Sequence, residues 1–235
     1  MKNVISMNAY GRRQSDSREG RLLRACRERM QQHLAGALKK MLGKVDDALF
    51  ELAEKAENNA LQSRYFDAMR EVRLKRDGIE ETFSRALVEG FEAALEPRGD
   101  TAETSETGEL GLVEDEVLEE NLAVRNMVTR VRIDARQELG MLERRLGELL
   151  HDPWLDRHEN PVGPEVICEA FRLALGDVES GIEVKLIILK LFDRYVVTED
   201  IPPLYRALNA WLVQEGVLPQ LTLTQLRREG MPGPR

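Results

Sequence analysis

The chain has 235 residues, of which 42% are hydrophobic and 32% are charged, and its formal net charge at pH 7 is −8. That length suffices for a domain with a buried core. The negative charge argues against a general nucleic-acid binder, which needs a basic surface. The 2 cysteines cannot supply a disulfide framework, and the sequence lacks both a secretory signal and an apolar run that could span a membrane. These features indicate a reduced, cytoplasmic protein.

Charge is distributed unevenly along the sequence. Residues 1–45 carry eleven Lys or Arg against three Asp or Glu, and residues 96–123 carry ten acidic residues against one Arg. Segments of opposite charge attract each other at close range, within one chain or between two chains.

The N-terminal half reads as a helical arm that follows a flexible tail. Residues 1–19 are polar and have no periodicity, so we expect them to be flexible. Apolar residues then recur every three or four positions from residue 20 to 95, which predicts helices, with Gly43 as the end of the first one. An unbroken helix over residues 45–95 would be a rod of about 75 Å. Such a rod needs a long neighbouring helix or a partner chain to cover it.

The next two segments are a linker and a second long helix. Residues 96–112 combine Pro and Gly with Thr, Ser and Glu, which is typical of a flexible acidic linker. Residues 113–150 have an apolar seam that approximates a heptad repeat, and we expect this helix to pair antiparallel with the arm.

The C-terminal part predicts a compact helical subdomain over residues 151–219, followed by a loosely held tail over 220–235. Its short helices are expected at 164–176, 181–197 and 202–216, with Pro164 at a first helical position. The predicted fold is therefore all-α, an elongated antiparallel long-helix bundle with a small C-terminal helical subdomain.

The stretch SRYFDAMREVRLKRDGIE (63–80) is the main candidate for an interaction surface, because five basic residues lie there among Tyr65, Phe66 and Met69. The candidate partner or ligand face comprises Arg64, Tyr65, Phe66, Arg70, Arg73 and Arg76. One interpretation is a solvated helix with local ion pairs, since acidic residues lie three or four positions from each of four basic residues: Asp67 from Arg70, Glu71 from Lys75, Asp77 from Arg73 and Glu80 from Arg76. The others are a partner or oligomer contact that Phe66 anchors, or a phosphate site.

Other polar residues favour structural interpretations. The loop 151–160 contains residues that could ligate a metal: His151, Asp152, Asp156, His158 and Glu159. It lacks the histidine spacing of a zinc hydrolase, so we interpret it as a turn with Trp154 and Leu155 packed on the bundle. His33 is expected to be a half-buried polar residue and Cys168 a small core residue. Because no phosphate loop or nucleophile elbow is present, we expect no catalytic residues, metal or cofactor.

Four blocks of sequence carry a family resemblance: DDALFELAEKAENNALQSRYFDAMREVRLKRDGIEETF (46–83), LVEDEVLEENLAVRNMVTR (112–130), NPVGPEVICEAFRLAL (160–175) and VKLIILKLFDRYVV with LYRALNAWLVQEGVLP (within 184–219). They resemble successive blocks of a proteobacterial domain-of-unknown-function family whose members are sometimes labelled thymidine phosphorylase. The resemblance starts near residue 20 and corresponds to the N-terminal portion of longer members. It implies no established reaction, and the glycine-rich phosphate-binding segment of pyrimidine phosphorylases is missing.

The expected function is that of a non-enzymatic regulatory or scaffolding protein of the bacterial cytoplasm, which acts through protein–protein contacts and forms a dimer. Two alternatives remain open. The chain could be a signalling effector that binds a cyclic dinucleotide or another phosphate ligand through Arg64, Arg70, Arg73 and Arg76. It could also be a nucleic-acid accessory protein that uses the basic segment 1–45.

Overall fold

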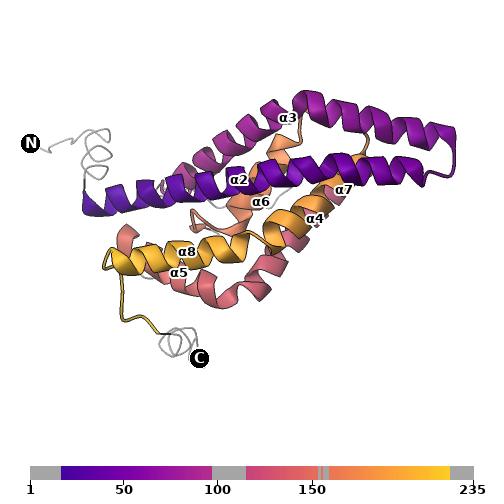
Figure 1. Cartoon of the computed structure of the whole chain (residues 1–235). Coiled ribbons are helices and arrows are strands. Elements are labelled where there is room, and N and C mark those ends of the chain that lie inside the picture. Colours follow the sequence, from indigo (N-terminus) through magenta and orange to yellow (C-terminus); the bar gives the residue numbers. More distant parts are fainter. Residues whose placement is uncertain (1–16, 97–114, 153–154, 156–158, 223–235) are drawn as a thin grey trace, which may run out of the picture.

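A long antiparallel hairpin of two helices organises the molecule (Figure 1). The computed structural model describes residues 17–96, 115–152, 155 and 159–222. The hairpin consists of α2 (Arg18–Glu54, 37 residues) and α3 (Asn59–Ala93, 35 residues). At 1.5 Å per residue, each helix is about 50–55 Å long. The side chains of Ser17 and Asn58 cap the two helices by accepting hydrogen bonds from backbone amides, at 3.0 and 2.9 Å.

The hairpin turns at a different place from the predicted one. α2 continues through Gly43, and residues 55–58 separate it from α3, so the expected unbroken rod over 45–95 is wrong. A glycine inside a helix costs about 1 kcal/mol. That cost is offset because the helix beyond Gly43 buries Val45, Leu49 and Ala53. The new helix starts where Asn58 is extended (φ −152°, ψ 159°).

The helix expected over 113–150 is divided into α4 (Asp115–Asp134) and α5 (Arg136–Leu150). Ala135, which separates them, departs from helical geometry (φ −103°, ψ 21°) and is fully buried. α4 packs mainly against α6 and α7, and α5 against α8. α5 also contacts α2, but the predicted antiparallel pairing of this segment with the second helix of the arm is wrong. Because the turn at 55–58 is short, α2 is the antiparallel neighbour of α3.

The remaining helices cover one side of the hairpin (Figure 1). They are α6 (Pro164–Ala174), α7 (Ile182–Phe192), the π-helix η2 (Asp193–Thr198) and α8 (Ile201–Gln214). Pro164 stands in the first turn of α6, as predicted. The rings of Phe171 and Phe192 are stacked with centroids 3.9 Å apart, and Phe83 of α3 meets both edge to face at 6.2 and 6.0 Å. A continuous hydrophobic core thus joins these helices to the hairpin.

The all-α fold with a long antiparallel helix pair is confirmed, and the described part of the chain contains no β-strand. None of the described helices is long and apolar enough to cross a bilayer. Several predicted segments lie largely outside the described residues: the tail 1–19 as far as residue 16, the linker 96–112 from residue 97, and the tail 220–235 from residue 223.

Candidate interaction surface

The outer end of the hairpin is the least covered part of the long helices. Figure 1 shows the turn between α2 and α3 at the far right, beyond the ends of the other labelled helices. No side chain from residue 54 to residue 67 is buried. We call residues 46–74, which include this turn, the arm tip. Helices in proteins gain most of their stability from packing. An uncovered helix end would therefore be stabilised by a further contact.

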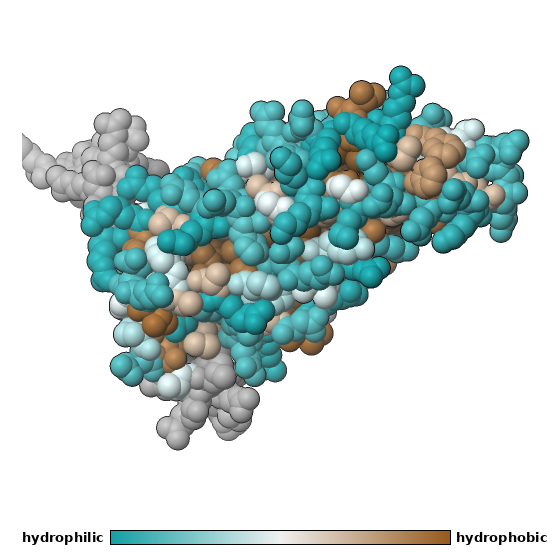
Figure 2. Space-filling view, in the orientation of Figure 1, coloured by the Kyte–Doolittle hydropathy of each residue, from teal (hydrophilic) through white to brown (hydrophobic). Residues whose placement is uncertain are grey.

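Large apolar side chains are exposed on the arm tip. Phe50 of α2 and Phe66 of α3 are 46% and 37% exposed, and their rings meet edge to face with centroids 6.2 Å apart. Leu74 is 77% exposed and lies two turns along α3 from Phe66. Figure 2 shows tan and brown groups among hydrophilic ones at this end of the hairpin. An aromatic pair surrounded by polar side chains is a common anchor for protein contacts.

The basic residues of the predicted face are mostly occupied in ion pairs. Arg64 pairs with Glu183 of α7 (3.1 Å) and Arg73 with Asp46 of α2 (2.9 Å). Arg76 pairs with Glu80 (3.1 Å) and also donates to the backbone carbonyl of Lys39 (2.8 Å). The predicted local pairs Glu71–Lys75 (2.9 Å) and Arg76–Glu80 (3.1 Å) are confirmed. The predicted pairs Asp67–Arg70 and Arg73–Asp77 are wrong, because Arg73 pairs with Asp46 of α2 instead and Arg70 has no carboxylate at ion-pair distance among the described residues.

Two residues of the predicted face behave differently from the others. Arg70 is exposed and makes no ion pair or hydrogen bond with any residue that the structure describes. It lies one turn from Phe66 and one turn from Leu74, so all three share a row on the surface of α3. Tyr65 is half-buried and packs against the hydrophobic core. Phe66 and Arg70 therefore lie on the exposed arm tip, and Tyr65 belongs to the packed side.

Charged side chains flank the aromatic pair on both helices of the arm tip. On α2, Asp46, Asp47 and Glu54 lie three or four positions from Phe50, and Asp47 and Glu54 are exposed. On α3, Arg70 and Arg73 lie one and two turns from Phe66. Carboxylates therefore lie near Phe50 on α2 and guanidinium groups lie near Phe66 on α3, and Arg73 pairs with Asp46 between the two helices.

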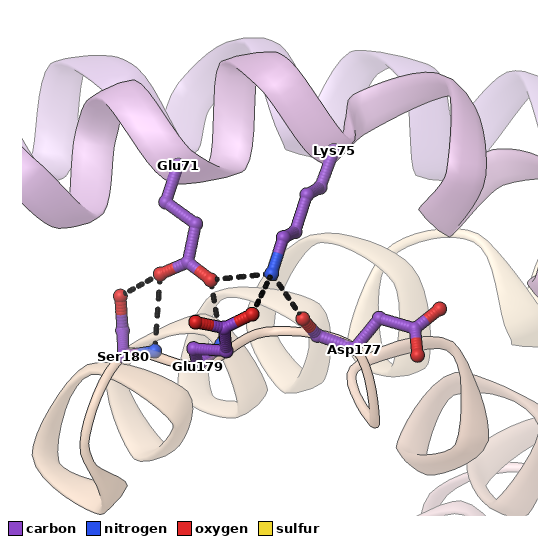
Figure 3. Close-up of polar contacts among 5 residues, drawn as sticks. All are labelled: Glu71, Lys75, Asp177, Glu179 and Ser180. Carbon is purple, nitrogen blue, oxygen red and sulfur yellow. Dashed lines mark hydrogen bonds and ion pairs between the residues drawn. The ribbon is translucent and has the colours of Figure 1, made fainter.

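A polar cluster fixes the turn before α7 to the middle of α3 (Figure 3). The carboxylate of Glu71 accepts hydrogen bonds from the amides of Glu179 (2.6 Å) and Ser180 (3.0 Å), and from the Ser180 hydroxyl. Lys75 donates to the backbone carbonyl of Asp177 and lies 3.3 Å from the Glu179 carboxylate. Burial of Glu71 opposes its ionisation, but these hydrogen bonds outweigh that effect and lower its pKa to about 2.

The other sequence candidates do not assemble into a reactive site. His33 is half-buried, and its Nε2 lies 3.1 Å from the backbone carbonyl oxygen of Asp200. Cys26 and Cys168 are fully buried; burial raises the pKa of Cys26 to about 12 and also raises that of Cys168. Asp156, His158 and Trp154 lie outside the described residues, and Leu155 packs partly against the core. Within the described ranges, no three His, Cys, Asp or Glu side chains are grouped so as to hold a metal ion.

Sequence reasoning missed Phe50 and Leu74, both of which are exposed on the arm tip. A signal was present, since Leu74 falls between the helical stripes of α3 and Phe50 directly follows the stripe residue Leu49. Apolar residues that fall off a buried stripe mark a second face of a helix. The same signal marks Leu118, Leu122 and Ile133 on α4, which are 61%, 57% and 69% exposed.

The fold and this surface define a class of protein: an all-α helical domain with a long hairpin that presents an apolar tip. Residues 18–216 match the family model described as Protein of unknown function (DUF1631) N-terminal domain. The chain belongs to this family, which agrees with the resemblance to a domain-of-unknown-function family. No curated protein matches the chain, and no solved structure does either.

Proposed function

We propose that this chain is a non-enzymatic regulatory or scaffolding protein of the bacterial cytoplasm that acts through protein–protein contacts, with the arm tip as a contact surface. The observation that carries this proposal is the exposed Phe50–Phe66 pair, which lies beside the turn where no side chain from residue 54 to residue 67 is buried. Covering such a surface contributes about 25 cal/mol per Å² of apolar area, which must exceed the entropic cost of association.

A second copy of the chain is the partner that the arm tip fits. In a twofold dimer the same patch faces itself, so it must be complementary to its own rotated image. The tip meets this condition because carboxylates flank Phe50 on α2 and guanidinium groups follow Phe66 on α3. Rotation places the acidic α2 of each copy opposite the basic α3 of the other and stacks the aromatic pairs between them.

The cyclic-dinucleotide alternative has less support, because Arg64, Arg73 and Arg76 each face a carboxylate. A phosphate ligand would have to compete with those carboxylates. The basic segment 1–45 of the nucleic-acid alternative is described only from residue 17. Protein contact therefore remains our proposal.

Sedimentation velocity tests the proposal through the double substitution Phe50→Ser/Phe66→Ser. The unaltered chain is expected to form a concentration-dependent dimer at micromolar concentration, and the variant is expected to remain monomeric. Val213→Ser serves as the control, because Val213 on α8 is 36% exposed, close to the 37% of Phe66. A dimer that survives the arm substitutions but is lost in Leu118→Ser/Leu122→Ser would place the interface on α4 and reject the arm tip.

Charge exchange gives a second test of the twofold geometry. Arg70→Glu and Asp47→Lys are each expected to weaken the homodimer, because each places like charges opposite one another. Mixing the two variants is expected to restore a heterodimer. Absence of recovery in the mixture would contradict the proposed orientation.

A further inference from the structure

Four exposed cations lie about the junction of α2 with the end of α7. Lys40 and Lys44 are one turn apart on α2, and Lys190 of α7 is four residues before Arg194 of η2. None of the four has a carboxylate within ion-pair distance among the residues that the structure describes. This contrasts with the arm, where most basic residues are paired. We call these four residues and Tyr195 the Tyr195 patch.

The ring of Tyr195 holds two of these cations. Lys44 Nζ lies 4.7 Å from the ring centroid and Arg194 Cζ lies 5.1 Å from it. The two positive charges are therefore within about 10 Å of each other. Each cation–π contact holds its cation over the ring, but it does not neutralise the charge. The two cations therefore repel each other, and a bound anion would reduce this repulsion.

The π-helix places Arg194 and Tyr195 at this point and directs the neighbouring acid elsewhere. Asp193, which precedes them, pairs with Arg130 of α4 at 2.8 Å. The hydroxyl of Thr198 donates to the Asp193 carbonyl at 2.9 Å, which helps to close the wide turn. π-Helices are rare in proteins, and those that occur often lie at functional sites. The arrangement therefore keeps the nearest carboxylate of η2 away from the two cations.

We propose that the Tyr195 patch binds an acidic polypeptide segment of a partner protein. A nucleic acid needs an extended basic footprint, whereas the Tyr195 patch offers four cations on a molecule of net charge −8. The exposed carboxylates of Asp47 and Glu199 lie near the patch in sequence and limit its extent. A short run of Asp or Glu matches this small area, and its carboxylates can form charge-assisted hydrogen bonds with Lys44 and Arg194.

Fluorescence anisotropy of a labelled octaglutamate peptide with the whole chain tests this proposal. We expect saturable binding, weakened at least about tenfold by Lys44→Glu/Arg194→Glu, because two charge contacts become repulsive. The control Lys55→Glu/Arg85→Glu reverses the same number of charges at exposed residues that pair with Glu51 and Glu89. It is expected to change binding less than about threefold. Equal losses of peptide binding in both variants would show that the overall charge of the protein explains the loss, and they would overturn the proposal.

Two further measurements distinguish the aromatic ring from net charge and a peptide from a nucleic acid. Tyr195→Phe keeps the ring and is expected to retain binding, whereas Tyr195→Ala is expected to weaken it by about threefold without changing charge. A single-stranded oligonucleotide with eight phosphates is expected to bind more weakly than the peptide. Tighter binding of the oligonucleotide would mean that the patch binds a nucleic acid instead of an acidic polypeptide, and it would overturn the proposal. Phe50→Ser/Phe66→Ser is expected to leave peptide binding unchanged, so this result does not depend on the arm tip.

Discussion

At the residue scale, Glu71 is the side chain that most directly connects the hairpin to the C-terminal helices. Its carboxylate satisfies two backbone amides and a hydroxyl in the turn before α7 and also pairs with Lys75. Hydrogen bonds to a charged group typically stabilise a protein by about 1.5–3 kcal/mol. Replacing the carboxylate therefore removes the main polar link between α3 and this turn.

We expect Glu71→Gln to lower the free energy of unfolding at pH 7 by about 1–3 kcal/mol. The pKa of Glu71 is about 2 in the folded protein against 4.5 for an ordinary glutamate. A lowered folded pKa means that the stabilisation is complete above about pH 4.5 and is lost as pH falls toward 2. Urea unfolding measured from pH 7 to pH 3 should show the two chains converging. Glu81→Gln, at an exposed position, is the control, and a gap that stays constant with pH would contradict the assignment.

The arm tip shows what residue-level reasoning from sequence can reach. Charge spacing correctly identified the pairs Glu71–Lys75 and Arg76–Glu80, because these pairs lie within one helix. It could not foresee that Arg73 pairs with Asp46 or Arg64 with Glu183, since those partners come from other helices. Phe66 was predicted as a possible anchor from its basic neighbours, but its ring partner Phe50 depends on how α2 and α3 align.

At the element scale, one glycine in α2 and one in α3 affect stability in different ways, through helix propensity in one case and through packing in the other. Gly43 lies inside α2, and a Cβ added there would meet no atom within 4 Å. Gly90 lies inside α3 where a Cβ would come 2.9 Å from Val166 Cγ1 of α6. One glycine thus only weakens its helix, whereas the other allows two helices to approach closely.

Gly43→Ala is expected to raise the free energy of unfolding by about 0.5–1 kcal/mol, because alanine is the better helix former. Gly90→Ala is expected to lower it by about 1 kcal/mol or more, because the added methyl group displaces Val166 or α6. For a chain of this size, 1 kcal/mol corresponds to a shift in Tm of about 2–4 °C. Thermal unfolding by circular dichroism measures both. A loss of stability in Gly43→Ala would favour the predicted helix end at Gly43 over a continuous α2.

Helix existence was predictable from sequence, but helix ends and partners were not. The apolar spacing of three and four residues correctly gave an all-α fold and most of the buried seam of α4 and α5, including Met127, Leu139 and Leu146. The break at Ala135 carries no proline or glycine signal. It arises because α4 and α5 follow different neighbours, α6 and α7 on one side and α8 on the other. Such tertiary preferences override local propensity.

At the scale of the whole molecule, the hairpin is a long element supported mainly along its inner part. The C-terminal helices bury Phe83 and Phe91 of α3 completely or nearly so, whereas no side chain from residue 54 to residue 67 is buried. Regions with few buried contacts open with a small free energy compared with the core. The same property that leaves the arm tip accessible to a partner therefore makes it the weakest part of the hairpin when the chain is alone.

Hydrogen exchange followed by mass spectrometry measures this gradient directly. In dilute protein we expect amides of residues 50–66 to exchange faster than those of the inner hairpin, because opening the tip exposes little apolar surface. If the proposed dimer forms, raising the protein concentration is expected to slow exchange at the tip alone, since association stabilises the bound state by mass action. Phe50→Ser/Phe66→Ser is expected to keep fast exchange at every concentration, and Val213→Ser to behave like the unaltered chain. Protection of the tip that does not vary with concentration would mean that the hairpin end is stable alone and does not require a second copy.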